Sequence, residues 1–114
     1  MFDDFRDRGY DFSFAYCHSI KLNHPTDEEI IQKQLDDTDL RVKHLPDYFV
    51  PTASCMWDPS PRIEKGILME NTPERWARNW KLSPESYRVL LKKLLERMES
   101  LPKDSYANRL MMID

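Results

Sequence analysis

The sequence contains only two glycines, Gly9 and Gly66, which lie far apart in a chain of 114 residues. Glycine-rich loops bind phosphate groups because a residue without a side chain lets the backbone approach them closely. Two separated glycines form neither the G-x-G-x-x-G loop of dinucleotide-binding proteins nor the G-x-x-x-x-G-K phosphate loop. The sequence therefore excludes both of these nucleotide-binding motifs.

Cysteine is equally scarce, since Cys17 and Cys55 are the only two and they form no C-x-x-C pair. Two cysteines cannot supply a zinc site that needs three or four thiolates, and the H-E-x-x-H and G-x-S-x-G motifs of zinc proteases and serine hydrolases are absent. Two cysteines are also too few for a disulfide framework, so we expect reduced thiols. We predict no bound metal, no cofactor and no catalytic residue.

Long hydrophobic runs are missing as well. No stretch approaches the roughly 18 consecutive apolar residues of a membrane-spanning helix, and the first residues lack the basic flank and apolar run of a signal peptide. We therefore expect a cytoplasmic protein that does not bind a membrane. A composition of 32% charged and 40% hydrophobic residues is typical of globular proteins. The length allows one hydrophobic core, so we predict a single domain over residues 1–114.

Positive charge is not in excess, because 20 acidic residues outnumber 17 basic ones and leave a net charge of −3. The acidic residues are concentrated in residues 1–58, whereas residues 59–114 are mildly basic. Neither half has the strong charge excess of a nucleic-acid-binding protein or of a DNA mimic.

Bulky side chains alternate with small or polar ones through residues 10–22. This spacing of two is typical of a half-buried β-strand, because successive side chains of a strand point to opposite faces. The bulky positions are Tyr10, Phe12, Phe14, Tyr16, His18, Ile20 and Leu22.

A helix is predicted to follow this strand. Thr26 and Glu29 form a capping box, in which each side chain accepts a hydrogen bond from the other residue's backbone N–H. The helix should therefore begin at Asp27. We expect it to end near the pair Asp36 and Asp37, because two acidic residues are unfavourable at the negative end of a helix.

Four prolines interrupt residues 46–61, and each restricts the backbone and removes a hydrogen-bond donor. The segment nevertheless carries Tyr48, Phe49 and Trp57, so we interpret it as an extended strap that packs across a core rather than as a free linker. A short strand is predicted before it, over residues 40–45. A further strand is predicted after it, over residues 63–69.

Two helices are predicted in the C-terminal part, at residues 73–80 and 84–100. Thr72 and Ser83 are each followed by proline and glutamate, a helix-start signal. The second helix has a leucine-rich stripe at helical spacing, whereas the first would place Trp76 and Trp80 on one face. A last short helix is predicted near residues 105–112.

The fold class that these segments indicate is α+β. A small N-terminal sheet or hairpin, with the irregular proline-rich strap, would pack against two or three C-terminal helices. Residues 1–70 would form the extended part with one short helix, and residues 71–114 the helical part.

Two chemical functions compete with a binding function. Cys17, His18 and His24 carry donor groups that zinc prefers, but neighbours on a strand point to opposite faces and a buried inert thiol is the more common outcome. Arg75, Arg78 and Lys81 lie near tryptophans and could bind nucleic acid. Interleaved glutamates favour a solvated, salt-bridged surface instead, so we regard nucleic acid as a minor alternative.

The leading hypothesis is a non-catalytic accessory subunit or protein-binding module of a larger cytoplasmic assembly. The chain has more aromatic surface than so short a fold readily buries, and tryptophan and tyrosine are enriched at interfaces. The partner would be another protein subunit or a second copy of this chain. The predicted contact residues are Tyr10, Phe12, Phe14, Tyr48, Phe49, Trp57, Trp76 and Trp80. The alternatives are a small enzyme or metal-binding protein centred on Cys17, His18 and His24, or a weak nucleic-acid binder.

Overall fold

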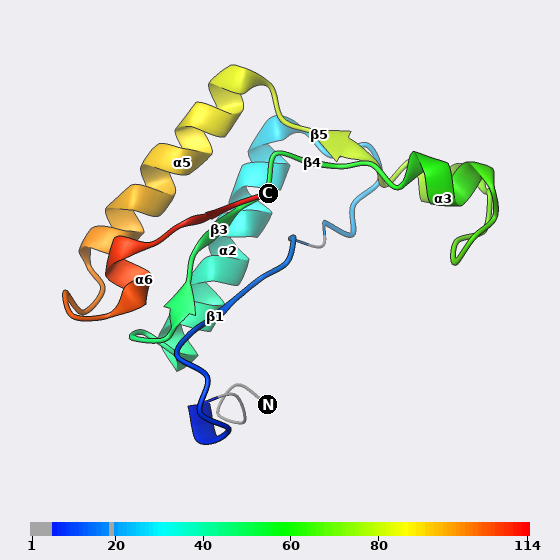
Figure 1. The fold of residues 1–114 in the computed structure, drawn as a ribbon. Helices are drawn as coiled ribbons and strands as arrows, with labels where there is room; N and C mark the ends of the chain where they lie inside the picture. The colour runs from blue at the N-terminus through cyan, green and yellow to red at the C-terminus, as the bar shows by residue number, and fades with distance from the viewer. Residues whose placement is uncertain (1–5, 19) are drawn as a thin grey trace.

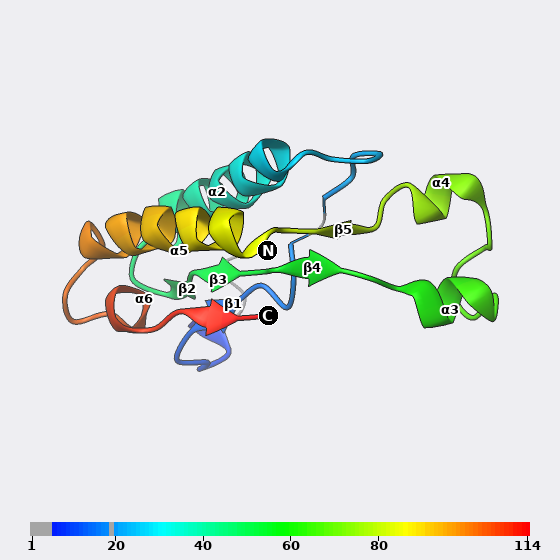
Figure 2. The same ribbon diagram turned by 90° about the horizontal axis from the view of Figure 1, so that it is seen from above.

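A computed structural model of the chain describes residues 6–18 and 20–114. Two long helices lie side by side on one side of a layer of short strands, as Figures 1 and 2 show, so the α+β class is confirmed. The helices are α2 (Asp27–His44), α3 (Ser60–Glu64), α4 (Pro73–Trp76), α5 (Pro84–Glu99) and α6 (Tyr106–Arg109). The strands are β1 (Ser13–Phe14), β2 (Phe49–Val50), β3 (Thr52–Ala53), β4 (Met56–Trp57), β5 (Trp80–Lys81) and β6 (Met112–Ile113).

The proline-rich strap is the centre of the strand layer. Its strands β2, β3 and β4 pair with β1 in parallel, with β6 in parallel and with β5 in antiparallel orientation. Residues 48–54 are all buried, which confirms that the strap packs across a core. The predicted N-terminal strand is much shorter than residues 10–22, because among the described residues of this range only Ser13 and Phe14 pair with the strap; residue 19 lies outside the described residues.

Helix α2 begins as predicted, since Glu29 donates its backbone N–H to Thr26 Oγ1 and Thr26 donates its own to Glu29 Oε1, both at 3.2 Å. The predicted end near Asp37 is wrong, and so is the strand at residues 40–45, because the helix continues to His44. Asp37 is accommodated within the helix because it accepts hydrogen bonds from Arg41, one turn later, and from His18. Residues 1–70 therefore contain a long helix rather than one short helix.

The strand predicted at residues 63–69 is also wrong. Residues 60–64 form α3, and a turn follows in which both Gly66 and Leu68 have a positive φ, of 62°. Apolar residues alone suggested a strand here. The left-handed backbone at Leu68 is incompatible with extended pairing.

Helix α5 confirms the prediction for residues 84–100, and α6 forms within residues 105–112 with Ser105 as its cap. The helix predicted at residues 73–80 is shorter, because α4 ends at Trp76. Trp80 instead lies in β5 opposite Trp57, so Trp76 and Trp80 do not share a helix face.

The main hydrophobic core lies between the two long helices and the strap. Its central side chains, Ile30 and Leu35 of α2 and Leu90 and Leu94 of α5, are fully buried and form one cluster with Ala53 of the strap. A smaller core holds the N-terminal segment against the end of α2, through Ala15, Leu45, Tyr48 and Phe49. In residues 6–18 and 20–114, no helix has the length and apolar content needed to span a bilayer.

Candidate functional site

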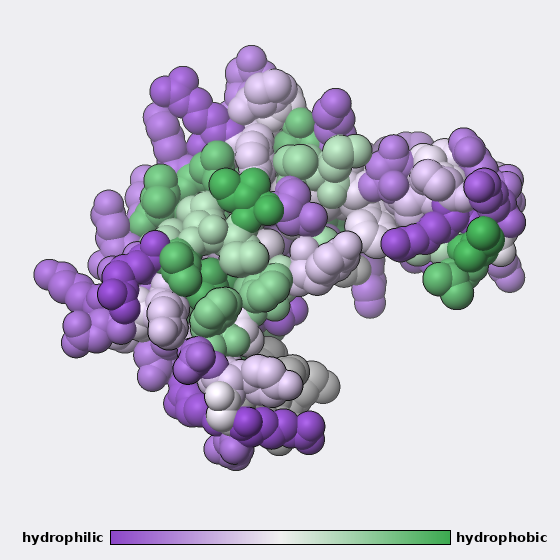
Figure 3. Space-filling view, in the orientation of Figure 1, coloured by the Kyte–Doolittle hydropathy of each residue, from purple (hydrophilic) through white to green (hydrophobic). Residues whose placement is uncertain are grey.

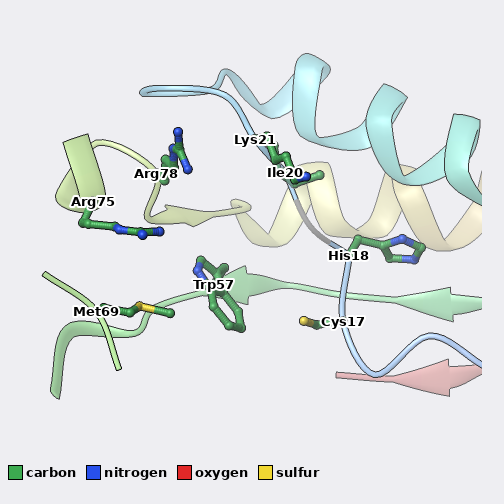
Figure 4. A pocket seen from close by; sticks show the side chains of 8 residues that line it. All are labelled: Cys17, His18, Ile20, Lys21, Trp57, Met69, Arg75 and Arg78. Atoms are coloured by element: carbon green, nitrogen blue, oxygen red, sulfur yellow. The ribbon is translucent and has the colours of Figure 1, made fainter. Parts of the chain in front are cut away.

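A pocket of about 260 Å³ opens beside Trp57 of β4, where residues 17, 18, 20 and 21 lie near residues 69, 75 and 78. We call it the Trp57 pocket. Figure 4 shows Arg75 and Arg78 on one side, Lys21 and Ile20 on another, and Trp57 and Met69 below them. The lining side chains are Cys17, His18, Ile20, Lys21, Trp57, Met69, Arg75 and Arg78.

Three contacts fix the walls of this pocket. Pairing of β4 with β5 places Trp57 opposite Trp80, and the half-buried Trp57 side chain packs against the main core. His24 donates its backbone N–H to the carbonyl of Ala77 at 2.7 Å, which holds the segment after Lys21 beside the end of α4. Asn79 donates its side-chain amide to Asp58 Oδ1 at 3.3 Å and joins the ends of β4 and β5.

The charge of the pocket is positive. Lys21, Arg75 and Arg78 are exposed, and within residues 6–18 and 20–114 none of them forms an ion pair. The apolar side chains of Ile20, Trp57 and Met69 line the same pocket. The pocket therefore combines three available positive charges with an aromatic wall.

His18 lines the pocket and is buried. Its Nδ1 lies 2.9 Å from Asp37 Oδ2 and its Nε2 lies 2.8 Å from the carbonyl oxygen of Thr52. Both partners are hydrogen-bond acceptors, so both ring nitrogens donate at once only when the ring carries two protons. The ring has no free lone pair for a metal while these two hydrogen bonds are in place.

The carboxylate of Asp37 is held in its charged form by this arrangement. Burial acts to raise the pKa of Asp37, but hydrogen bonds from His18 and Arg41, together with their positive charge, outweigh burial and lower it. The pair therefore links the segment before Ile20 to the middle of α2.

Cys17 is not activated as a nucleophile. Burial, followed by the negative charge of Asp114, raises the pKa of its thiol and so reduces the fraction of reactive thiolate. In the described part of the chain, no group of three histidine, cysteine or acidic side chains has the geometry to hold a metal ion. His24 and His44 are exposed, and His18 is already engaged.

A second candidate surface is an apolar area on the strand layer, which we call the aromatic patch: Phe12, Phe14, Tyr16, Tyr106, Met112 and Ile113. Phe14, Tyr16, Met112 and Ile113 line one shallow hollow of about 270 Å³. The ring centroid of Phe12 lies 6.4 Å from that of Phe14 and 5.4 Å from that of Tyr106. Figure 3 shows hydrophobic residues gathered over this side of the molecule, next to α5 and the C-terminal strand.

The structure divides the eight predicted contact residues into four groups. Tyr48, Phe49 and Trp80 are buried, so the folded chain offers little of their surface to a partner. Phe12 and Phe14 lie in the aromatic patch, whereas Trp57 lines the Trp57 pocket. Tyr10 and Trp76 are exposed but lie outside both.

The three basic residues considered for nucleic-acid binding do not line one common pocket. Arg75 and Arg78 line the Trp57 pocket together with Lys21, whereas Lys81 lies in β5 and lines a separate hollow with Met56 and Asn79. Lys21 was not predicted to lie near the arginines, because the contact of the following segment with Ala77, more than 50 positions later in the chain, has no local sequence pattern. Ile113 and Tyr16 of the aromatic patch are also absent from the predicted contact residues, although Tyr16 belongs to the alternating pattern of residues 10–22.

Comparison with known proteins gives no relative. No family model matches the chain, and neither the curated proteins nor the solved structures contain a match. Function is therefore inferred from the geometry described above.

Proposed function

We propose that this protein is a non-catalytic binding module, an accessory subunit of a cytoplasmic assembly, which docks on another protein through the aromatic patch. The observation that carries this proposal is the exposure of adjacent apolar side chains around one hollow. Tyr16 is 80% exposed and Ile113 is 69% exposed, and Phe14, which is 45% exposed, lines the same hollow. Contiguous exposed apolar surface with aromatic residues is typical of protein interfaces.

The shape and composition of the patch favour a protein partner. Its hollow is shallow, and among the described residues that line it Asp114 alone is charged. Arg109 lies at the border, with its guanidinium carbon 5.8 Å from the Tyr106 ring centroid. An apolar centre with charged residues at its border is the usual arrangement of an interface.

The chemistry of the remaining groups also supports a binding role. The raised pKa of Cys17 disfavours thiolate chemistry, and both ring nitrogens of His18 are held by structural acceptors. The enzymatic and metal-binding alternatives are centred on these two groups and on His24, which is exposed. Neither Cys17 nor His18 is arranged to react.

The test compares three variants that each introduce one lysine at an exposed apolar position. Tyr16→Lys and Ile113→Lys change the patch, whereas Leu40→Lys changes a residue of α2 that is 52% exposed and lies outside the patch. Tagged proteins are used to capture partners from native cell extract, and light scattering of each purified chain gives its oligomeric state.

We expect one stoichiometric partner that the wild type and Leu40→Lys capture equally. Both patch variants should reduce its recovery by about tenfold or more, because loss of a central interface side chain costs about 2 kcal/mol. A dimer of the purified chain that both patch variants dissociate would identify the partner as a second copy. A monomer whose captured proteins are the same for all variants would contradict the proposal.

A further inference from the structure

We infer that the Trp57 pocket binds a nucleotide, with its phosphate between Arg75, Arg78 and Lys21 and its planar base against Trp57. This inference is independent of the aromatic patch and of the protein partner proposed above. It needs neither of the glycine-rich motifs that the sequence excludes, because side chains rather than backbone amides would hold the phosphate.

The positive charge of the Trp57 pocket favours an anionic ligand. Lys21, Arg75 and Arg78 converge on one pocket and carry no acidic partner in the described part of the chain, although the whole protein has a net charge of −3. In a chain rich in carboxylates, three unpaired cations around one pocket make it complementary to an anion. Guanidinium groups match phosphate oxygens in particular, because their planar array of N–H donors binds two oxygens at once.

The aromatic wall is the second argument. Trp57 presents its indole to the same space as the cations, and Ile20 and Met69 add apolar surface beside it (Figure 4). A simple anion such as phosphate alone would leave this wall in contact with water. A base stacked on an indole gains about 1 to 3 kcal/mol, and stacking does not require a particular base.

The size of the pocket limits the ligand. A volume of about 260 Å³ lies just below the usual range for small-molecule sites, which begins at about 300 Å³. It suits one base with one phosphate, and it is too small for a dinucleotide cofactor or for a duplex. The same chemistry occurs in a free mononucleotide and in an unpaired nucleotide of a single strand.

The test measures binding by isothermal titration calorimetry at low ionic strength. The probes are adenosine 5′-monophosphate, adenosine, inorganic phosphate, a short single-stranded oligonucleotide and an acidic peptide of equal length. We expect adenosine 5′-monophosphate to bind at least about tenfold more tightly than adenosine or phosphate, since stacking and charge both contribute.

Matched charge variants locate the site. The double variant R75Q/R78Q should weaken binding of the monophosphate by about tenfold or more, because it removes two charge-assisted contacts. The control R88Q removes an exposed arginine of α5 that does not line the pocket, and it should leave affinity unchanged within about twofold. All of the substituted arginines are exposed, so circular dichroism should show an unchanged fold.

The oligonucleotide identifies the source of the nucleotide. Binding about tenfold tighter than that of the monophosphate would indicate a single strand, and equal or weaker binding would indicate a free nucleotide; both results support the inference. Three results would overturn it: no heat of binding with any nucleotide, equal affinity for phosphate and the monophosphate, or an affinity that R75Q/R78Q does not change. Tighter binding of the acidic peptide than of either nucleotide probe would also overturn it.

Discussion

The buried side chain of Gln34 joins helix α2 to the strap by hydrogen bonds. Its Nε2 donates to the carbonyl oxygen of Ser54 at 2.8 Å, and its Oε1 accepts the Ser54 backbone N–H at 2.9 Å. The hydroxyl of Ser54 in turn accepts the backbone N–H of His18 at 3.3 Å. Gln34 and Ser54 are fully buried, so water cannot replace these bonds.

We predict that Gln34→Ala lowers the free energy of unfolding by about 2 to 4 kcal/mol, because two buried backbone groups of Ser54 lose their partners. Urea unfolding followed by circular dichroism measures the change. Gln32→Ala is the control, since Gln32 is exposed and donates to the exposed side chain of Asp36; it should change the free energy of unfolding by less than about 0.5 kcal/mol. Equal losses in the two variants would show that the Gln34 bonds contribute no more than a surface contact.

At the scale of elements, the sequence predicts where helices start much better than where they end. Thr26, Thr72 and Ser83 each accept a backbone N–H within their own first turn, so the start signal is complete within a few residues. The end of α2 depends on His18, which lies 19 positions before Asp37. That distant partner has no signature in the local pattern.

The same distinction applies to the candidate sites. Arg75 and Arg78 are visible as basic residues of one short segment, and Phe12 and Phe14 as part of an alternating pattern. Their neighbours are set by strand pairing: β4 with β5 brings Trp57 to the arginines, and β3 with β6 brings Ile113 to Phe14. Short strands of two residues carry too little pattern for these pairings to be predicted.

Asp37 makes the attachment of α2 to the N-terminal segment dependent on pH. The groups that face it are His18 from that segment and Arg41 from α2, and the same hollow contains Lys33 and Asp36. Because the pKa of Asp37 is lower in the folded chain than in the unfolded chain, its contribution is complete above the ordinary aspartate pKa of about 4. The contribution is lost as pH falls through the lower, folded value.

We predict that Asp37→Asn destabilises the protein at pH 7 by about 1 kcal/mol, allowing for the partial exposure of the carboxylate. The difference in free energy of unfolding between variant and wild type should shrink as pH is lowered below about 4, where the native carboxylate becomes protonated. Unfolding in urea at several pH values measures it. The exposed neighbour Asp36→Asn should show a smaller difference, and a difference for Asp37→Asn that does not change with pH would contradict the prediction.

At the scale of the whole molecule, residues 58–79 form an arm that projects from the two-layered body, as Figures 1 and 2 show. Helices α3 and α4 contact each other in it, and Ile63, Ala77 and Pro59 are its buried residues. Leu68 at its turn is 89% exposed. With so little buried surface, the arm contributes much less to the global stability than α2 and α5 do.

The Trp57 pocket lies where the arm joins the body. Arg75, Arg78 and Met69 come from the arm, whereas Trp57 is fixed to the body by the main core. The hydrogen bond from His24 to Ala77 ties the segment after Lys21 to the arm. A ligand that binds both sides would favour conformations in which the arm is closed on the body. Because the arm of low stability supplies part of the pocket wall, binding of such a ligand would also hold the arm against the body.

We predict that amide hydrogens of the arm exchange with solvent much faster than those of the core, although both groups are hydrogen bonded. The Ile67 N–H donates to the carbonyl of Arg62 at 2.9 Å, and Leu94 lies within helix α5 with its side chain fully buried. Exchange at Ile67 requires only local opening of the arm, whereas exchange at Leu94 requires opening of the core, with a free energy that approaches that of global unfolding. Hydrogen–deuterium exchange resolved by NMR measures both rates on one sample. Equal protection of the two amides would show that arm and body open together, and the arm would then be an integral part of the core.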